Sequence, residues 1–289
     1  MEKKRVDLHT HSIYSDGCNT PQEILEKARK KNITTLAITD HDNIEGSKEL
    51  IRIGTGKIRV YSGVELTIKV KKGRFHLLGY NIDLENEQLN KELKEIKETS
   101  IYNTLLYIEK LKQEFGIPIP KEEIDNLLKI KGNIGRPQIA HILIKLGYCS
   151  TVKEAFDRYL ITVYEKSRRK KKGISAEEGI DLIKNAGGEP IIAHPNSLKL
   201  KNQELDQYVK YLKEHGLSGL ETIHINESNE ERKFYHELAQ KYDLLETGGT
   251  DFHGITVKPD VELGYGRNHN VEIEENTLSF TQKIKSRYQ

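Results

Sequence analysis

Short aliphatic runs and helix-like patterns alternate along the first and last thirds of the chain. The runs are typical of buried strands, whereas the stretches between them repeat apolar residues at helical spacing. One such stretch begins with Thr20-Pro21-Gln22-Glu23, which combines a capping residue, proline at the first helical position and Glu three residues after the cap. This alternation predicts an α/β fold with a closed or nearly closed parallel barrel. Strands are expected at residues 6–8, 35–38, 60–64, 75–80, 191–193, 217–225 and 244–248.

The middle of the chain lacks these strand signals. From Asn86 to about Tyr159 the pattern predicts successive helices at residues 90–115, 121–129, 137–146 and 152–159. A second capping box, Ser175-Ala176-Glu177-Glu178, marks the point at which strands and helices alternate again. The expected organisation is a barrel formed by residues 1–85 and 175–289, interrupted by a helical insertion domain at residues 86–174.

Composition and charge narrow the classes of function. The 289 residues include 46 Lys and Arg against 44 Asp and Glu, and a net charge of +2 argues against binding polyanions over the whole surface. Two cysteines cannot form a disulfide framework and fit a reducing compartment. The first twelve residues contain no apolar stretch for a signal peptide, and no run approaches the roughly 18 apolar residues of a membrane span. We therefore expect a soluble cytoplasmic protein that does not associate with membranes.

Candidate metal ligands accompany most of the expected strands. In α/β barrels the C-terminal strand ends form the reaction face, because the loops there converge on the barrel mouth. Imidazoles and carboxylates gathered at one mouth are suited to hold several divalent cations. The candidates at strand ends are His9, His11, Asp40, His41, Glu65, His194, Asp251 and His253, and His76 lies early in its strand.

Each of these signals also has a structural interpretation. Two histidines on one strand face recur by chance, Asp40-His41 could be a turn with a helix cap, and the segment 247–253 could be only a Gly-rich turn. Their joint occurrence at successive strand ends is much harder to explain structurally, so we favour a metal centre. Four histidines without this placement are expected to be ordinary surface or helix residues: His141, His215, His236 and His269.

Seven segments carry a resemblance to a known family. They are Asp7-Leu8-His9-Thr10-His11-Ser12, Tyr14-Ser15-Asp16-Gly17, Thr39-Asp40-His41-Asp42, Gly63-Val64-Glu65, His76-Leu77-Leu78-Gly79-Tyr80, Ala193-His194-Pro195 and Thr250-Asp251-Phe252-His253. Together and in this order they resemble the polymerase and histidinol phosphatase (PHP) family of metallophosphoesterases. The resemblance implies a distorted seven-stranded (β/α) barrel, (β/α)7, with a trinuclear metal centre.

The resemblance also implies which residues hold each ion. The first ion would be held by His9, His11, Glu65 and Asp251. The second would share Glu65 and add His76 and His194, and the third would be held by Asp16, His41 and His253. Asp40 would orient the ligating histidines. Mn²⁺ is the expected metal, with Fe²⁺, Zn²⁺ and Mg²⁺ as alternatives.

Clustered metal ions suit phosphoester hydrolysis, because they neutralise charge on the phosphoryl group and activate water. We expect a metal-bound hydroxide, bridging the first two ions, to attack phosphorus in line with the leaving oxygen. His224 or His194 could assist the leaving group, and the sequence alone does not assign the general acid.

The helical insertion resembles that of one PHP subgroup, through residues 135–141 and 147–160. The subgroup contains 3′,5′-nucleoside bisphosphate phosphatases and 5′-to-3′ exoribonucleases acting on short RNA. Its insertion contributes an arginine to the substrate phosphate, which implies this role for Arg136; the alternative is an arginine exposed at a helix N-terminus. The chain departs from the subgroup at Gln138 and His141, and in the segment 222–227. The basic run Lys166 to Lys172 is interpreted either as a solvated loop or as an electrostatic guide for a nucleotide or RNA end.

The leading functional interpretation is a metal-dependent phosphatase that cleaves a phosphate monoester of a small nucleotide, such as a 3′,5′-bisphosphate. A 5′-to-3′ exonuclease on short RNA or DNA oligonucleotides is the main alternative. A histidinol phosphatase and a non-catalytic PHP module that binds nucleic acid or a partner are further alternatives. The expected binding partner is a small phosphorylated nucleotide or a short oligonucleotide, and no obligate protein partner is inferred.

Overall fold

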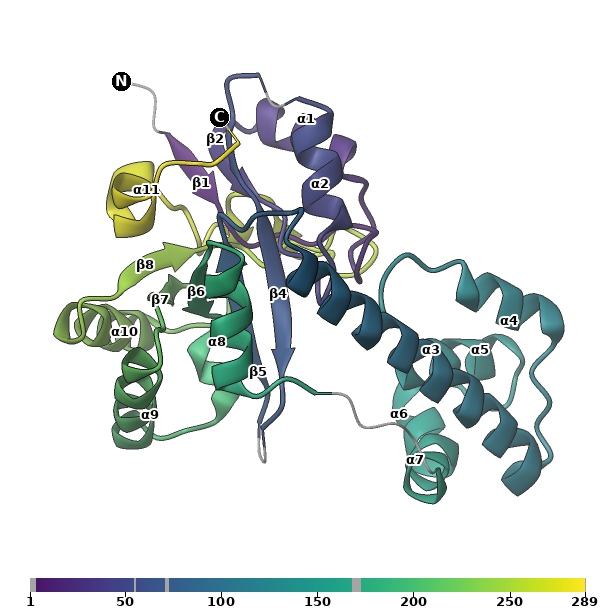
Figure 1. Cartoon of the computed structure of the whole chain (residues 1–289). Helices are drawn as coiled ribbons and strands as arrows, with labels where there is room; N and C mark the ends of the chain where they lie inside the picture. The colour runs from purple at the N-terminus through teal and green to yellow at the C-terminus, as the bar shows by residue number, and fades with distance from the viewer. Residues whose placement is uncertain (1–3, 55, 71–72, 168–172, 289) are drawn as a thin grey trace. The chain divides into compact units, whose positions relative to one another are not determined.

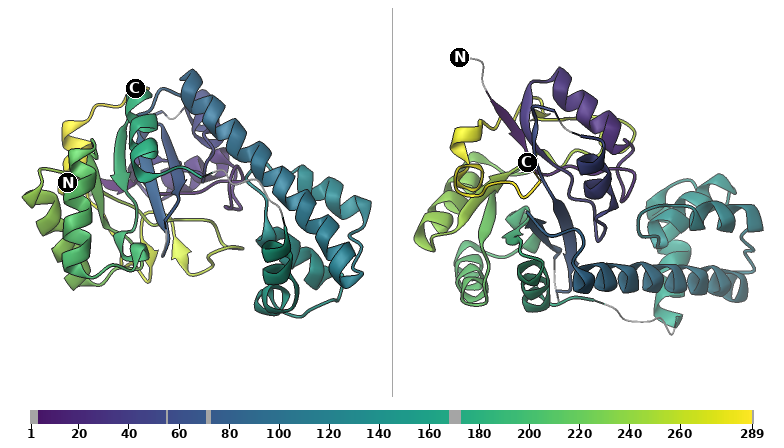
Figure 2. Two further views of the ribbon diagram at one scale, coloured as in Figure 1. Left: turned by 60° about the horizontal axis from the view of Figure 1, so that its bottom comes forward. Right: turned by 45° about the horizontal axis from the view of Figure 1, so that its top comes forward.

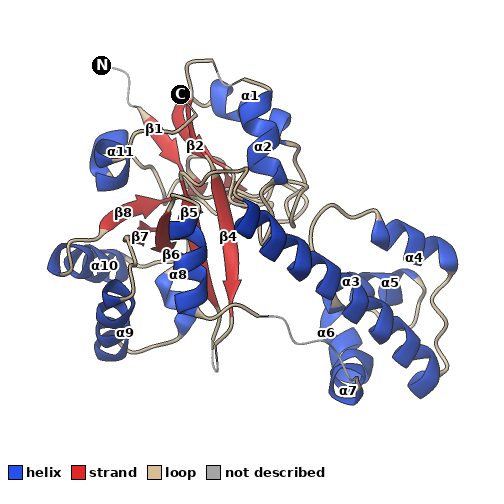
Figure 3. Cartoon of the chain, viewed as in Figure 1, coloured by secondary structure: helices blue, strands red, loops and turns tan. Residues whose placement is uncertain are grey.

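The computed structural model describes residues 4–54, 56–70, 73–167 and 173–288. The chain separates into two compact units. The strand-containing unit comprises residues 1–90 and 173–289, and the helical unit comprises residues 91–172. Figure 3 shows that the strands of the described residues lie in the first unit, whereas the second consists of helices and loops. The fold is therefore of the mixed α/β type.

Eight strands of the strand-containing unit form two sheets (Figure 1). A three-stranded parallel sheet has the order β1 (Arg5–Asp7), β2 (Ile33–Ala37), β3 (Arg59–Tyr61). A five-stranded sheet has the order β4 (Gly63–Ile68), β5 (Phe75–Tyr80), β6 (Glu189–Ile192), β7 (Gly219–Ile223), β8 (Leu245–Gly248). Two further short strands, β9 (Val261–Glu262) and β10 (Gly266–Arg267), pair with each other in antiparallel fashion.

The strand directions differ from the sequence expectation at β5. This strand runs antiparallel to both of its neighbours, β4 and β6, whereas β6, β7 and β8 run parallel. Only residues 69–74 connect β4 to β5, and a connection this short joins antiparallel strands, because a parallel crossover needs a dozen or more residues. The expectation that all strands of the barrel run parallel is therefore wrong.

The strand expected at residues 60–64 is broken at Ser62. Its first half, β3, belongs to the three-stranded sheet, and its second half begins β4 of the other sheet. At the break, Ser62 O accepts from Asn81 N at 2.8 Å and Ser62 Oγ donates to Ile82 O at 2.7 Å. The sequence predicts Glu65 at a strand end. In the structure this residue lies inside β4.

Isolated contacts connect the two sheets at the C-terminal ends of β1, β2 and β8. Leu8 N donates to Gly248 O at 3.2 Å, and Thr10 pairs with Phe252 just beyond these strands. His41, after β2, forms a bridge with Glu65 of β4. These contacts are not continuous ladders, and no closed barrel is defined among the described residues. They nevertheless bring together the segments that follow β1, β2 and β8.

Helices cover the outside of the two sheets. They are α1 (Pro21–Lys30), α2 (Glu45–Arg52), α8 (Ala176–Asn185), α9 (Asn202–Glu214), α10 (Asn229–Lys241) and α11 (Ser279–Lys283). Figure 2 shows from two further directions that they lie on the outer side of the strands. The expected N-terminal signals of α1 and α8 are confirmed, because Thr20 with Glu23 and Ser175 with Glu178 form reciprocal capping boxes.

The helical unit has a hydrophobic core of its own. Its elements are the C-terminal part of α3 (Glu87–Phe115), α4 (Lys121–Leu128), α5 (Arg136–Lys145), α6 (Val152–Ala155), a π-helical turn (Phe156–Leu160) and α7 (Ile161–Lys166). The helix expected at 152–159 is thus continued through a π-helical turn to Lys166. Leu111, Ile139 and Leu143 are among its fully buried core residues. Across both units, no helix of the described residues combines the length and the apolar character needed to cross a membrane.

Candidate metal centre

The nine metal ligands expected from the sequence lie together in the strand-containing unit. Ligand atoms of these residues form four groups in which all atoms lie within 4.8 Å of one another. Together the groups contain all nine residues: His9, His11, Asp16, His41, Glu65, His76, His194, Asp251 and His253. Seven of them line a cavity of about 580 Å³, and the fully buried His9 and His11 are the exceptions. We call this space the histidine cavity.

Glu65 occupies the middle of the arrangement. Its side chain is only 1% exposed, and its two carboxylate oxygens face different histidines. Oε1 lies 2.9 Å from both His76 Nδ1 and His194 Nε2. Oε2 lies 3.2 Å from His9 Nε2, His11 Nε2 and His41 Nδ1. One carboxylate is therefore shared between two sets of imidazoles.

Asp251 faces the same histidines from the segment after β8. Its Oδ1 lies 3.3 Å from His11 Nε2 and 3.7 Å from His9 Nε2. On its other side, Oδ2 accepts a hydrogen bond from the Lys258 ammonium group. The backbone of Asp251 has a φ of 51°, in the left-handed region that non-glycine residues avoid. Such strain costs about 1–3 kcal/mol and tends to persist at functional sites.

A third cluster surrounds Asp16, in the loop after β1. Asp16 Oδ1 lies 3.1 Å from His253 Nε2, and Oδ2 lies 3.8 Å from His41 Nε2. The Asp16 side chain is 49% exposed, unlike the buried carboxylate of Glu65. This cluster therefore lies at the solvent side of the histidine cavity.

Buried carboxylates fix the histidines from behind, and Glu221 is one that the sequence interpretation missed. Glu221 Oε1 lies 2.9 Å from His9 Nδ1, and Oε2 accepts from the His194 backbone N–H at 2.6 Å. The available signal was a lone acidic residue inside the apolar strand β7. Asp40, which was expected to orient the histidines, accepts from the hydroxyl groups of Ser12 and Ser15. It reaches the His11 ring only through Ser15, whose Oγ lies 3.4 Å from His11 Nδ1.

The charges of the cluster favour cations. Burial alone would raise the pKa of Glu65, but the neighbouring histidines hold this pKa well below its usual value. The same balance keeps the pKa of Asp251 well below its usual value. Burial lowers the pKa of His41 to about 3, so this ring is neutral at physiological pH. The carboxylates of Asp251 and Glu65, by contrast, raise the pKa of His11 to about 10 against the effect of its burial. A divalent ion would displace such protons, because imidazoles bind metals in their deprotonated form beside ionised carboxylates.

Three ring nitrogens provide a direct test of whether metal ions fit. His11 Nε2, His41 Nδ1 and His224 Nε2 are buried and have no hydrogen-bond partner among the described residues. Each faces a carboxylate oxygen at 3.2–3.4 Å without hydrogen-bond geometry. A buried polar atom without a partner costs about 1–3 kcal/mol, and a cation held between nitrogen and oxygen would satisfy both. The side chains present therefore fit the metal ions that the resemblance implies.

The two residues with expected roles on the substrate lie in different units. His224 follows β7, lines the histidine cavity and is 1% exposed. Asn226 N donates to its Nδ1 at 3.3 Å, and burial lowers the pKa of its ring. Arg136 is the first residue of α5 in the helical unit, where its guanidinium lies over the rings of Tyr164 and Phe156, 4.1 and 5.3 Å from their centroids.

The sequence also drew attention to Gln138, His141 and the basic run in the helical unit. Gln138 Oε1 accepts from Gly135 N at 2.9 Å and so completes the N-terminus of α5. His141 is exposed, in agreement with the expected ordinary role. Of the basic run, Lys166 forms an ion pair with Glu114, and residues 168–172 lie outside the described residues.

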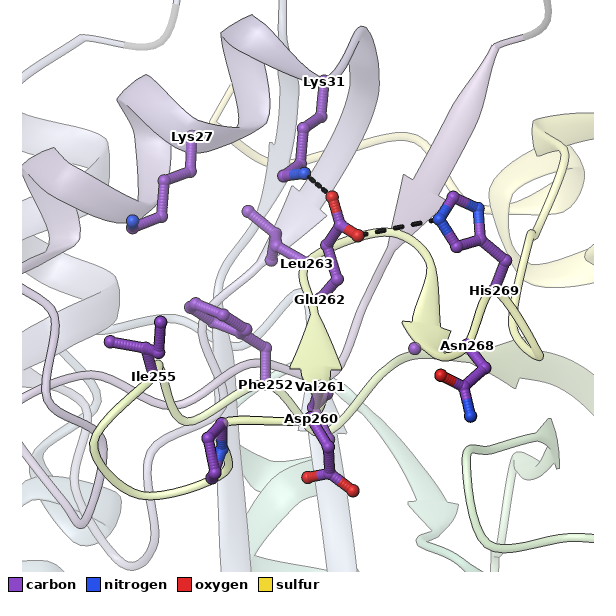
Figure 4. Close-up of a pocket in the computed structure, with 12 residues that line it drawn as sticks. Lys27, Lys31, Phe252, Ile255, Asp260, Val261, Glu262, Leu263, Asn268 and His269 are labelled. Carbon is purple, nitrogen blue, oxygen red and sulfur yellow. Dashed lines mark hydrogen bonds and ion pairs between the residues drawn. The ribbon is translucent and has the colours of Figure 1, made fainter.

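A second cavity, of about 480 Å³, also borders the segment 251–263 (Figure 4). Glu262 pairs there with both Lys31 and His269, and apolar groups such as Phe252 and Leu263 complete the lining. Lys31 and His269 are therefore paired with a carboxylate, whereas Lys27 also lines this cavity and has no ion pair among the described residues.

Comparisons with known proteins agree with this geometry. The profile of the PHP domain matches residues 7–245. The 5′-3′ exoribonuclease Rnm of Escherichia coli strain K12 is 30% identical over 267 residues, covering 89% of this chain and 87% of the relative. The 3′,5′-nucleoside bisphosphate phosphatase of Chromobacterium violaceum is 27% identical over 256 residues, covering 86% and 87%. A solved structure from Bifidobacterium adolescentis, assigned as a metal-dependent phosphoesterase, superimposes with a TM-score of 0.69 at 30% identity, covering 88% of this chain and 90% of the other. The chain therefore belongs to the PHP family and is a metal-dependent hydrolase of phosphoesters.

Proposed function

We infer that the chain hydrolyses a phosphate monoester of a small nucleotide, of the 3′,5′-nucleoside bisphosphate type, with three divalent ions in a distorted (β/α)7 barrel. The observation that carries this proposal is the convergence of nine imidazole and carboxylate side chains on one cavity. The 27% identity with a bisphosphate phosphatase over 86% of the chain supports the nucleotide substrate.

The proposed ions are assigned to three sets of side chains. As the resemblance implies, the first set is His9, His11, Glu65 and Asp251, the second is Glu65, His76 and His194, and the third is Asp16, His41 and His253. The two oxygens of Glu65 support a shared carboxylate between the first two sets. When bound, ions of this kind neutralise phosphate charge and lower the pKa of water. Mn²⁺ is the proposed metal, because it accepts both imidazole and carboxylate ligands.

The residues around the sets orient the ligands. Glu221 Oε1 accepts from His9 Nδ1, and this contact directs His9 Nε2 at Glu65, as the nitrogen that would face an ion. The Lys258 ammonium group fixes one oxygen of Asp251, so the other remains directed at the histidines. These contacts pre-organise the donor atoms before a substrate arrives.

His224 is the proposed residue that assists the leaving oxygen, by donating a hydrogen bond to it. Because Nδ1 of its neutral ring accepts from Asn226 N, the ring proton resides on Nε2. Nε2 lacks a hydrogen-bond partner among the described residues and belongs to a residue that lines the histidine cavity. It is therefore available to an oxygen atom of the substrate.

Arg136 is the proposed phosphate-binding residue of the helical unit. Stacking on Tyr164 occupies a face of the guanidinium and leaves its in-plane N–H groups available for a phosphate. The matching position in the related subgroup supports this role.

A 5′-to-3′ exonuclease on short oligonucleotides is the second candidate. It is favoured by the 30% identity with a 5′-3′ exoribonuclease over 89% of the chain. The two functions differ in whether the substrate continues beyond the second phosphate.

A substrate screen tests the proposal. Metal analysis of the purified protein would be followed by assays in Mn²⁺ with a nucleoside 3′,5′-bisphosphate, mononucleotides, histidinol phosphate and short 5′-phosphorylated oligonucleotides. The expected result is the highest kcat/KM on the bisphosphate. A higher kcat/KM on the oligonucleotides would assign the exonuclease, and hydrolysis of histidinol phosphate alone would refute both nucleotide functions.

A further inference from the structure

Two cations at the edge of the histidine cavity have no part in the reaction proposed above. Arg74 directly precedes β5, and Lys199 directly follows the 3₁₀-helix Pro195–Leu198. Both line the cavity and both are exposed. Neither side chain forms a hydrogen bond or an ion pair with another described residue. Both positive charges are therefore available to a bound molecule.

The backbone holds these two residues beside the metal centre. Arg74 N donates to Ser197 O at 3.0 Å, and Ser197 Oγ donates to Arg74 O at 3.0 Å. The same Ser197 Oγ lies 2.9 Å from His194 Nδ1, so one hydroxyl links Arg74 to a proposed metal ligand. Gly73 permits this close approach, because its φ is +75° and a Cβ there would lie 2.6 Å from Leu198 O.

The charge of the lining favours an anion at this edge. Apart from the proposed metal ligands, the charged residues that line the histidine cavity are Arg74, Lys199 and Lys258, all of them cationic. Lys258 is neutralised by Asp251, which leaves Arg74 and Lys199 without a carboxylate partner among the described residues. In the second cavity, one of the two lining lysines, Lys31, is paired with Glu262 (Figure 4). Unpaired cations at the rim of a cavity attract and hold anionic ligands.

The cavity is also larger than a single phosphate requires. Its volume of about 580 Å³ lies in the range of pockets that enclose a whole small molecule. A guanidinium can bind phosphate through two parallel hydrogen bonds, and a nearby ammonium group adds a point charge. If one phosphate of a nucleotide lies at the metal ligands, these two cations therefore remain available to its second phosphate.

We propose that Arg74 and Lys199 form a subsite for a second phosphate of the substrate, the one that is not cleaved. The proposal rests on the proposed function and specifies its substrate class, a nucleotide with phosphoryl groups at two positions. The second group is either a terminal phosphate or the phosphodiester that continues an oligonucleotide.

The test compares kinetics of the wild-type protein and the double variant R74Q/K199Q in Mn²⁺ with adenosine 3′,5′-bisphosphate. Removing charge-assisted hydrogen bonds to the second phosphate is expected to raise KM about tenfold or more, with kcat within about twofold of wild type. KM for adenosine 3′- and 5′-monophosphates is expected to rise about tenfold less than KM for the bisphosphate. A KM for the bisphosphate that stays near the wild-type value, or a fall in kcat, overturns the proposal.

Two matched variants separate a local loss of phosphate contacts from a general loss of positive charge. R52Q/K210Q removes one exposed arginine and one exposed lysine outside the cavity, and its KM is expected to match wild type. R74K/K199R retains both charges and is expected to restore most of the affinity. Equal losses in R52Q/K210Q would mean that net charge, and not the subsite, determines KM.

The outcomes separate this proposal from the function on which it rests. If the wild-type protein hydrolyses neither the bisphosphate nor a 5′-phosphorylated dinucleotide, the proposed function fails. If it hydrolyses one of them and R74Q/K199Q retains the wild-type KM, only the subsite is refuted. A selective rise in KM for the dinucleotide supports the subsite and identifies the second group as a phosphodiester, whereas a selective rise for the bisphosphate identifies a terminal phosphate.

Discussion

Two cavities border the segment from Asp251 to Leu263, and charge is arranged differently in each of them. In the second cavity, Glu262 lies between Lys31 and His269, so acid and base neutralise each other (Figure 4). In the histidine cavity, by contrast, buried ring nitrogens face the carboxylates of Glu65 and Asp251 without hydrogen-bond geometry.

This difference in the pairing of polar groups shows which property distinguishes the ligand site in this molecule. The cavities have similar volumes, about 480 and 580 Å³, and both contain charged and polar side chains. Only the histidine cavity concentrates buried polar atoms that lack a partner within the described part of the chain. Such atoms cost stability in the free protein, and a bound cation would offset that cost. The predictions below test this contrast, beginning with the largest effect.

The largest effect is expected from removing a ligand of the proposed first ion. His9→Ala and Asp251→Ala should each lower kcat/KM by about 10³-fold or more, because phosphate charge would no longer be neutralised. Steady-state assays in Mn²⁺ measure the loss, and circular dichroism checks that the variants remain folded. His236→Ala is the matched control, since His236 is a half-exposed histidine on α10 that pairs with Glu246. Activity retained by Asp251→Ala with metal still bound would refute the assignment.

Metal removal should also destabilise the strand-containing unit. An ion present at 100 times its dissociation constant stabilises the folded state by about 2.7 kcal/mol. For a unit of this size, that energy corresponds to a rise in Tm of about 5–10 °C. Thermal unfolding with Mn²⁺ and with a chelator measures the difference, which Glu65→Gln should abolish. An equal Tm under both conditions would contradict a metal centre built around Glu65.

Much of the centre could be predicted from the sequence, because its residues lie just beyond short apolar runs. His9, His41 and His194 follow β1, β2 and β6, and the C-terminal ends of strands meet at one end of an α/β fold. The apolar run of β5 does not show its direction, which follows instead from the short connection of residues 69–74, a signal that the sequence interpretation did not use. The break at Ser62 was missed for a similar reason, because residues 60–64 are mostly apolar on both sides of it.

The residues that surround the metal ligands could not be predicted from the sequence for a different reason. Glu221, Arg74 and Lys258 belong to no local pattern, and each acquires its position from contacts with distant segments. Glu221 contacts His9 across more than two hundred residues of chain, and Arg74 contacts the turn after His194. Only the folded topology brings these partners together.

An intermediate effect is expected at Glu221, which contacts the proposed ligands from behind. Glu221→Gln keeps the shape of the side chain but removes the charge that fixes the His9 tautomer, so the dissociation constant for Mn²⁺ should rise about 10–100-fold. Calorimetric titration measures this change. Glu227→Gln is the control: burial raises the pKa of Glu227 to about 9, so the variant replaces a neutral acid with a neutral amide. Equal weakening in both variants would mean that packing, and not charge, explains the effect.

The smallest effect is expected in the second cavity. Glu262→Gln removes the partner of both Lys31 and His269, which are surface groups in partial contact with solvent. Exposed ion pairs contribute about 0–1 kcal/mol, so Tm should change by only a few degrees and kcat/KM should stay within about twofold of wild type. The variant leaves Lys31 without its carboxylate and so adds an unpaired cation to this cavity beside Lys27. A large change in turnover of a nucleoside bisphosphate would show that the segment 251–263 couples the two cavities, and the contrast drawn between them would then fail.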